Sequence, residues 1–259
     1  MKLLIGDIGN TVTKVSIIDV KRYKSIKNFY FDSNKIVNQN FLKKNFKINN
    51  NKKIFNLYAL FSSVVPKYKN KLKSYLIKNY NIKLIEIMNK KIKKNIIINI
   101  KNRKQVGSDR IANAIGVYNK YKINCIVVDF GTATTFDVVT KKGVYNGGVI
   151  APGVNLSIKN LVYSADQIPF FKLKMQKKII GKNTLEALRS GFYWGYSGLI
   201  RNIIERIEKE TNTKYKIIFT GGYANFFQKS LSRSVTVDKN ITINGIIEIF
   251  KKNRKYLTK

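Results

Sequence analysis

The sequence contains no histidine and only one cysteine, three prolines and 14 acidic residues among 259. Without histidine there is no imidazole base, so a general base has to be sought first among the carboxylates. The single cysteine, Cys125, excludes an internal disulfide framework, and its apolar neighbours predict a buried strand position. No apolar run approaches the roughly 18 residues that a membrane helix needs. These absences predict a soluble cytoplasmic protein without a membrane partner.

Lysine is what the sequence has in excess. The 42 Lys and 8 Arg outweigh the acidic residues and give a formal net charge of +36. Such a charge favours partners rich in phosphate, because binding releases their counterions. However, Lys, Ile and Asn, the residues of A/T-rich codons, make up 109 of the 259 residues, and lysine is spread along the whole chain. Compositional bias explains the charge better than a nucleic-acid site, in which clustered arginine is typical.

A short internal sequence repeat indicates a duplicated architecture. An apolar strand leads into Asp7-x-Gly9 and then into a second strand, and the same pattern recurs at Asp129-x-Gly131, 122 positions later. This spacing is close to half the chain length, and the alternative is a chance repeat of a short pattern. We therefore predict an α/β protein with two halves, residues 1–118 and 119–259.

Helix signals place several polar residues at helix starts. Pro66–Tyr80 has a helical apolar stripe with proline at its start. Ser108 is a predicted N-cap, which puts Asp109 in the first turn. Asn183, with a glutamate three residues later, predicts a long helix to about Glu210 with Thr184 in its first turn, where free N–H groups can meet an anion.

Glycines interrupt the second half of the chain. We expect turns at Tyr145–Gly148 and Ala151–Gly153, another at Thr220–Gly222, and a last helix from about Asn244. Glycine lets backbone N–H groups approach a polyphosphate, and an aspartate beside it can hold a cation. The P-loop and dinucleotide-binding signatures are both absent from the sequence. Two Asp-x-Gly hairpins and a third glycine turn predict a nucleotide held in an interdomain cleft.

Several segments together carry a resemblance to a known family. They are Asp7–Thr11, Gly107–Arg110 with Asn113, Asp129–Thr135, Gly147–Gly153 and Thr220–Gly222, and Ile241–Ile249 is similar to the family's final strand and helix. In this order the set resembles the type III pantothenate kinases. The resemblance implies an acetate and sugar kinase/Hsp70/actin-like fold, with two RNase H-like halves around an interdomain ATP cleft. It also implies the first step of coenzyme A biosynthesis, in which ATP phosphorylates pantothenate.

The resemblance also implies roles for individual residues. Those matching the ATP-binding residues are Asp7, Ile8, Gly9, Asn10, Thr11, Val12, Thr13, Lys14 and Thr132. Those matching the pantothenate-binding residues are Gly107, Ser108, Asp109, Arg110 and Thr184, with Asp109 as the catalytic base. Asp129 matches a ligand of the monovalent cation, K⁺ or NH₄⁺, and Mg²⁺ would accompany ATP. The family further implies a homodimer.

Other interpretations stay open. In isolation Asp109 is typical of a charge favoured at a helix N-terminus, and Thr184 is typical of a mere helix start. Arg110 could pair with the pantothenate carboxylate or with an ATP phosphate. Ile100 stands where the family has a substrate-contacting tyrosine, so a kinase for another small alcohol is one alternative. Another is a non-catalytic nucleic-acid-binding regulator on the same scaffold, supported only by the charge.

Overall fold

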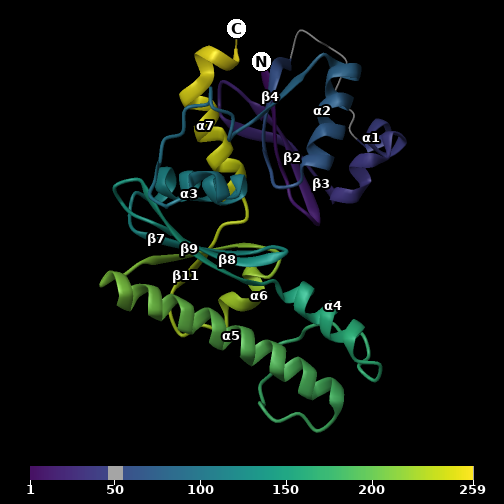
Figure 1. Cartoon of the computed structure of the whole chain (residues 1–259), viewed down its shortest axis with the longest axis vertical. Coiled ribbons are helices and arrows are strands. Elements are labelled where there is room, and N and C mark those ends of the chain that lie inside the picture. Colours follow the sequence, from purple (N-terminus) through teal and green to yellow (C-terminus); the bar gives the residue numbers. More distant parts are fainter. Residues whose placement is uncertain (46–54, 259) are drawn as a thin grey trace. The chain divides into compact units, whose positions relative to one another are not determined.

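The computed structural model describes residues 1–45 and 55–258 of the chain (Figure 1). They form two compact units, each made of separate stretches of sequence. Unit 1 comprises Met1–Lys122, Lys142–Tyr145 and Asn240–Lys259, and unit 2 comprises Ile123–Lys141 and Asn146–Lys239. Within the described residues, no helix is both long and apolar enough to span a bilayer.

Unit 1 is built on a five-stranded sheet. Its strand order is β3 (Lys24–Asp32), β2 (Val12–Asp19), β1 (Lys2–Ile8), β4 (Phe55–Ser63) and β5 (Lys83–Glu86). The first three strands are antiparallel, whereas β4 runs parallel to β1 and β5 parallel to β4. Asp7 of β1 lies in register with Ser62 of β4. Because these two strands are parallel, both residues lie at the same end of the sheet.

The helices of unit 1 come from distant parts of the chain. They are η1 (Ser33–Val37), α1 (Gln39–Asn45), α2 (Pro66–Tyr80), η2 (Arg103–Gln105), α3 (Ser108–Tyr121) and α7 (Ile241–Leu257). Helix α7 packs directly against α3 (Figure 1). A Cβ at Gly245 would lie 1.8 Å from the carbonyl oxygen of Ala112, so only glycine allows this close approach. The short β6 (Ile97–Ile98) pairs with Val144–Tyr145 inside the same unit.

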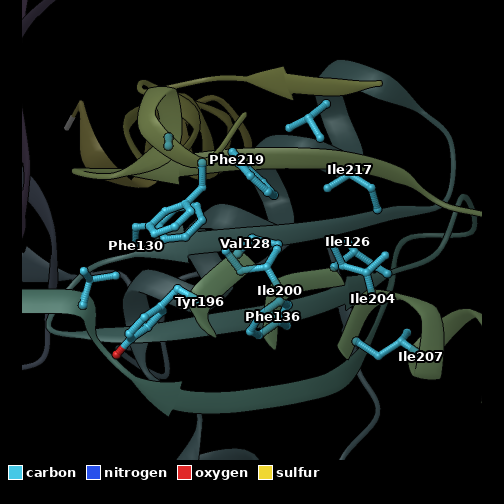
Figure 2. Packing of buried hydrophobic residues seen from close by; sticks show 14 of the residues in the cluster. Ile126, Val128, Phe130, Phe136, Tyr196, Ile200, Ile204, Ile207, Ile217 and Phe219 are labelled. Atoms are coloured by element: carbon cyan, nitrogen blue, oxygen red, sulfur yellow. The ribbon is translucent and has the colours of Figure 1, made fainter. Parts of the chain in front are cut away.

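Unit 2 has a mixed sheet with a long helix packed on it. The strands follow the order β11 (Val235–Val237), β10 (Lys216–Gly221), β7 (Cys125–Phe130), β8 (Ala133–Val139) and β9 (Val144–Pro152). The helices are α4 (Val154–Ser164), α5 (Thr184–Thr211) and α6 (Ala224–Gln228). Figure 2 shows Tyr196, Ile200 and Ile204 of α5 meeting side chains of β7, β8 and β10, such as Val128, in the buried core.

Several local predictions are confirmed. Helix α2 covers the predicted Pro66–Tyr80, and α5 begins at Thr184 with Asn183 as its N-cap, whose side chain accepts from the Glu186 N–H. Asp109 lies in the first turn of α3 as predicted. Cys125 is buried in β7, with its thiol reduced.

Other local predictions are wrong. The N-cap of α3 is Gly107, and Ser108 is the first helical residue. The glycines of Gly147–Gly153 do not break the chain into turns, because residues Val144–Pro152 form one strand, β9, in which Gly147 takes up a φ of +87°. The last helix starts at Ile241, ahead of the predicted Asn244, so all of Ile241–Ile249 is helical and the final strand is β11.

Candidate functional site

The first Asp-x-Gly hairpin presents an open tip. Strands β1 and β2 pair up to Ile8 and Thr13, and the turn between them leaves Asn10, Thr11 and Val12 exposed. The Gly9 N–H donates to the Val12 carbonyl at 3.1 Å, and a Cβ at Gly9 would lie 2.9 Å from the same oxygen. This tight turn leaves a polar, accessible loop of the kind that can approach a phosphate chain.

Not every predicted residue of this hairpin faces outward. The side chains of Ile8 and Thr13 are fully buried, so any contact of theirs with a nucleotide would come from the backbone. The Lys14 ammonium lies over the Tyr30 ring, 5.3 Å from its centroid, and donates to Asn240 Oδ1 at 3.0 Å. Lys14 is therefore held near the hairpin by β3 and by the residue that precedes α7.

The start of α3 carries the predicted base. The Asp109 carboxylate folds back over Gly107, whose Cβ, if present, would lie 2.4 Å from Asp109 Oδ1. The same oxygen accepts from the Arg110 N–H at 2.8 Å. Burial raises the pKa of the Asp109 carboxyl above its ordinary value, although the Arg110 N–H and the Arg110 charge act in the opposite direction. A carboxylate with a raised pKa is a better proton acceptor, as a general base requires.

Unit 1 brings the first hairpin and the α3 start together. Ser62, in register with Asp7, has its hydroxyl 2.9 Å from the hydroxyl of Ser108, the neighbour of Asp109. Arg110 lies on the same helix turn, and its guanidinium carbon is 5.9 Å from the centroid of the Tyr145 ring. The predicted phosphate hairpin and the predicted pantothenate segment therefore lie side by side in one compact unit.

The second hairpin lies in unit 2 and is closely packed by glycines. Asp129 of β7 is in register with Thr220 of β10, and a Cβ at Gly221 would lie 2.6 Å from both Asp129 Oδ1 and the Phe130 carbonyl oxygen. Gly221 has a φ of +84°, which favours glycine independently of the lack of space. Thr132 is exposed at the hairpin tip, and its carbonyl oxygen would be 2.1 Å from a Cβ at Gly153.

Thr184 is exposed in the first turn of α5. The turn is closed by a reciprocal pair: Asn183 Oδ1 accepts from the Glu186 N–H at 2.9 Å, and Glu186 Oε2 accepts from the Lys182 N–H at 2.8 Å. These hydrogen bonds are local to the helix start. They explain the position of Thr184 but do not connect it to the Asp129 hairpin.

Comparison with known proteins concerns the chain as a whole. Residues 3–206 match the family model of type III pantothenate kinases. A curated type III pantothenate kinase from Pelagibacter ubique (strain HTCC1062) is 48% identical over 246 residues, which is 95% of this chain and 97% of that protein. The chain belongs to the type III pantothenate kinase family.

Solved structures give the fold of this type III family member. A conserved Campylobacter jejuni protein, assigned to the Baf family of transcriptional activators, aligns over 98% of this chain and 100% of its own with a TM-score of 0.64 and 23% identity. The activator of a 2-hydroxyisocaproyl-CoA dehydratase from Clostridium difficile, solved with ADPNP, aligns over 99% and 97% with a TM-score of 0.53 and 10% identity. At such identities the likeness concerns the fold alone, which is of the acetate and sugar kinase/Hsp70/actin-like type.

Two residues that support the hairpins and glycine turns of this type III chain were not predicted from the sequence. Ser33 donates its hydroxyl to the Gly9 carbonyl at 2.6 Å and also bonds Thr13, so it braces the first hairpin from outside the motif. In unit 2, the Tyr223 hydroxyl donates to Asn155 Oδ1 at 2.5 Å and ties the third glycine turn to the start of α4. The only sequence signal for Tyr223 was its position directly after Gly222.

Proposed function

We propose that this chain transfers the γ-phosphoryl group of ATP to the primary hydroxyl of pantothenate, which gives 4′-phosphopantothenate and ADP. The observation that carries the proposal is the Asp109 carboxylate at the start of α3, beside the first phosphate hairpin in unit 1. Family membership supplies the substrates.

In the reaction, the pantothenate hydroxyl oxygen attacks the γ-phosphorus and the bond from that phosphorus to the oxygen bridging to the β-phosphate breaks. The hydroxyl proton passes to Asp109, and the negative charge of the leaving group stays on ADP. Gly107 permits the carboxylate to fold over the backbone, since any larger residue would collide with it. Arg110, next to the base, supplies a cation for an anionic group of either substrate.

Phosphate binding is assigned to the two hairpins. In unit 1, the exposed Asn10 and Thr11 offer donors, and Lys14 adds a positive charge. In unit 2, the exposed Thr132 offers a hydroxyl. Mg²⁺, when bound with ATP, neutralises charge on the phosphates. Among the described residues no cluster of three or more Asp, Glu, Cys or His side chains could hold a metal.

Asp129 is the proposed ligand of the monovalent cation, K⁺ or NH₄⁺. Its Oδ1 and the Phe130 carbonyl oxygen both lie against Gly221, where a Cβ would be 2.6 Å from each, and the carbonyl also accepts from the Gly222 N–H at 3.0 Å. Carboxylate and carbonyl oxygens are ligands that hard cations prefer. The donor set therefore fits a monovalent cation beside the second hairpin.

We also propose a homodimer in the cytoplasm. Unit 2 exposes several large apolar side chains on α4, on α5 and on the segment between them. They include Leu156, Tyr163, Phe170, Met175, Ile179, Ile180 and Trp194. Apolar surfaces of this kind mark interfaces, and a second copy of the chain is the partner implied by the family. Light scattering of the purified protein tests this, and a monomer at micromolar concentration would contradict it.

A coupled assay with ATP, Mg²⁺, K⁺ and a panel of small alcohols tests the catalytic proposal. We expect ADP release only with pantothenate and a product heavier by one phosphoryl group in mass spectrometry. The panel is needed because Ile100, partly exposed, replaces the tyrosine of the family and lies next to Asn99, which donates to the Tyr145 carbonyl at 2.9 Å. Turnover of another alcohol in preference to pantothenate would contradict the substrate assignment.

A further inference from the structure

A buried cluster of three serines joins α3 to the central sheet of unit 1. The Ser108 hydroxyl lies 2.9 Å from the Ser62 hydroxyl, accepts from the Ser63 N–H at 2.8 Å and donates to the Ser63 carbonyl at 3.0 Å. Ser62 and Ser108 are 0% and 3% exposed, so water cannot replace these partners. A hydroxyl has one hydrogen to donate and two lone pairs, and all three are used here.

The cluster supplies hydrogen bonds to the backbone of β4 beyond its pairing with β5. The Phe61 carbonyl accepts from the Ile87 N–H at 2.8 Å, next to Phe61–Glu86, the final register pair of β4 and β5. Backbone N–H and carbonyl groups point to alternate edges of a strand, so those of Ser63, two residues after Phe61, point toward the same edge of β4 as those of Phe61. There the Ser108 hydroxyl both accepts from its N–H and donates to its carbonyl, as a neighbouring strand would do.

This cluster also lies between the two parts of the candidate site. Ser62 is the register partner of Asp7 in the first hairpin, and Ser108 directly precedes Asp109. One pair of hydroxyls, 2.9 Å apart, therefore connects the strand beside the phosphate hairpin with the first turn that carries the base. The Ser108 hydroxyl is engaged by Ser62 and Ser63 of β4, so a contact of Ser108 with a substrate would come from its backbone.

We propose that Ser108 is a positioning residue whose hydroxyl fixes the first turn of α3 against the end of β4 and so sets the place of the Asp109 carboxylate. The inference rests on the proposed role of Asp109 as the base. It concerns Ser108 itself, because this one hydroxyl makes all three hydrogen bonds that join the start of α3 to β4. An alanine here would leave the Ser62 hydroxyl and both backbone groups of Ser63 buried and without their partner, and the helix start would shift to relieve them.

Ser108→Ala and Ser62→Ala test the proposal through two readouts. The first is kcat, which should fall on the order of 10- to 100-fold in Ser108→Ala, as expected when a base is displaced by a fraction of an ångström to an ångström, with KM for ATP within about twofold. The second is the titration of Asp109 in the substrate-free protein, followed by NMR of carboxyl-labelled aspartate. A loosened helix start lets water reach the carboxylate, so its pKa should move from its raised position toward the ordinary 3.8.

Ser197→Ala is the matched control. Ser197 is buried in unit 2, 5% exposed, and donates to the Tyr193 carbonyl at 2.6 Å within α5. This variant should lower the melting temperature but leave kcat and the Asp109 titration unchanged. Ser62→Ala keeps the two bonds from Ser108 to Ser63, so it should fold even if Ser108→Ala does not, and it should shift both readouts in the same direction by less.

The two readouts separate this proposal from the proposed function. If the wild type phosphorylates no alcohol, the proposed function fails, while the NMR titration still decides whether Ser108 positions Asp109. A Ser108→Ala or Ser62→Ala protein that melts at a lower temperature but keeps the wild-type Asp109 titration would overturn the positioning role and leave Ser108 as a stabilising residue only.

Discussion

Asp109 is the residue on which the proposed chemistry depends. Asp109→Asn keeps the shape and the helix-start hydrogen bonding but removes the proton acceptor, so kcat should fall by about 10² to 10⁴ with ATP affinity within a few-fold. Because burial raises the pKa of Asp109, wild-type kcat/KM should rise with pH through a midpoint above 3.8, and this limb should vanish in the variant. Kinetics and ATP titration across pH measure both.

The competing role of Asp109 gives the opposite result. A charge that only favours the helix N-terminus would be worth about 0.3 to 1 kcal/mol of stability, and its loss would leave kcat nearly intact. Burial instead disfavours the charged carboxylate, so we expect no loss of melting temperature in Asp109→Asn near neutral pH. A less stable variant with close to wild-type turnover would show that the base lies elsewhere.

Asp129 gives a prediction about cations. In the proposed function its carboxylate holds a monovalent cation, which offsets the repulsion between this acid and the γ-phosphate of ATP. Activity should be higher in K⁺ or NH₄⁺ than in Na⁺ at equal ionic strength, and Asp129→Asn should lose both this dependence and most of the rate. Initial rates in the three salts measure it. Equal wild-type rates in all three would remove Asp129 from the cation role.

At the scale of elements, the α3–α7 crossing depends on two glycines. A Cβ at Gly245 would meet the Ala112 carbonyl at 1.8 Å, and one at Gly116 would meet the Ile241 carbonyl at 2.4 Å. Gly245→Ala should therefore destabilise unit 1 by about 1 to 3 kcal/mol, since packed backbone cannot yield easily. Denaturant unfolding measures the change.

Gly198 supplies the matched control for that substitution. It lies inside α5, and apart from its chain neighbours and the backbone of its own helix turn, no described atom would come within 4 Å of a Cβ at this position. Gly198→Ala should stabilise the protein by about 0.5 to 1 kcal/mol, because alanine loses less entropy than glycine in a helix. Equal effects of the two substitutions would mean that the α3–α7 crossing is not tightly packed.

A buried ion pair ties the end of α5 to the strands that follow. Burial alone would raise the pKa of Glu208, but hydrogen bonds from both terminal nitrogens of Arg233, from the Tyr215 N–H and from Lys214 outweigh it and lower the pKa from 4.5 to about 2. Since the folded pKa is depressed, this stability is fully present above pH 4.5 and is lost as pH falls toward 2.

Glu208→Gln should cost about 3 kcal/mol near neutral pH, because it leaves Arg233 partly buried without its partner. The cost should shrink as the solution is acidified through the window in which the wild type loses the same interaction. Urea unfolding of both proteins as a function of pH measures this. Glu248, 28% exposed and paired with Lys251, is the control, and Glu248→Gln should cost less than about 1 kcal/mol. A pH-independent difference for Glu208→Gln would contradict the depressed pKa.

At the scale of the whole molecule, the net charge of +36 calls for a binding test. If composition alone supplies the lysines, duplex and single-stranded DNA should bind without sequence preference, and the affinity should fall steeply with salt and be weak near physiological ionic strength. Fluorescence anisotropy with labelled oligonucleotides over a salt series measures this. A sequence-preferring complex that survives about 0.2 M salt would favour the regulator over the kinase.

The sequence by itself determined the features that depend on neighbouring residues. The proline start and apolar stripe fixed α2, Asn183 and Glu186 fixed the start of α5, and the two Asp-x-Gly motifs placed a hairpin in each unit. Helix periods, caps and tight turns are set by residues within about one turn of each other, so a single sequence displays them directly. Each family motif is likewise a short run of neighbouring residues, so the sequence alone was enough to identify the family.

Only the tertiary structure decided which distant segments meet. The last helix packs on α3 through Gly116 and Gly245 and through a 2.7 Å bond from Thr242 to Asn113, 129 residues apart. Ser108 looks like an N-cap by sequence, yet its hydroxyl bonds Ser62 and Ser63 of β4 instead. A side chain takes the partner that the fold brings within reach, and the path of the chain through space is not written in any local spacing of residues.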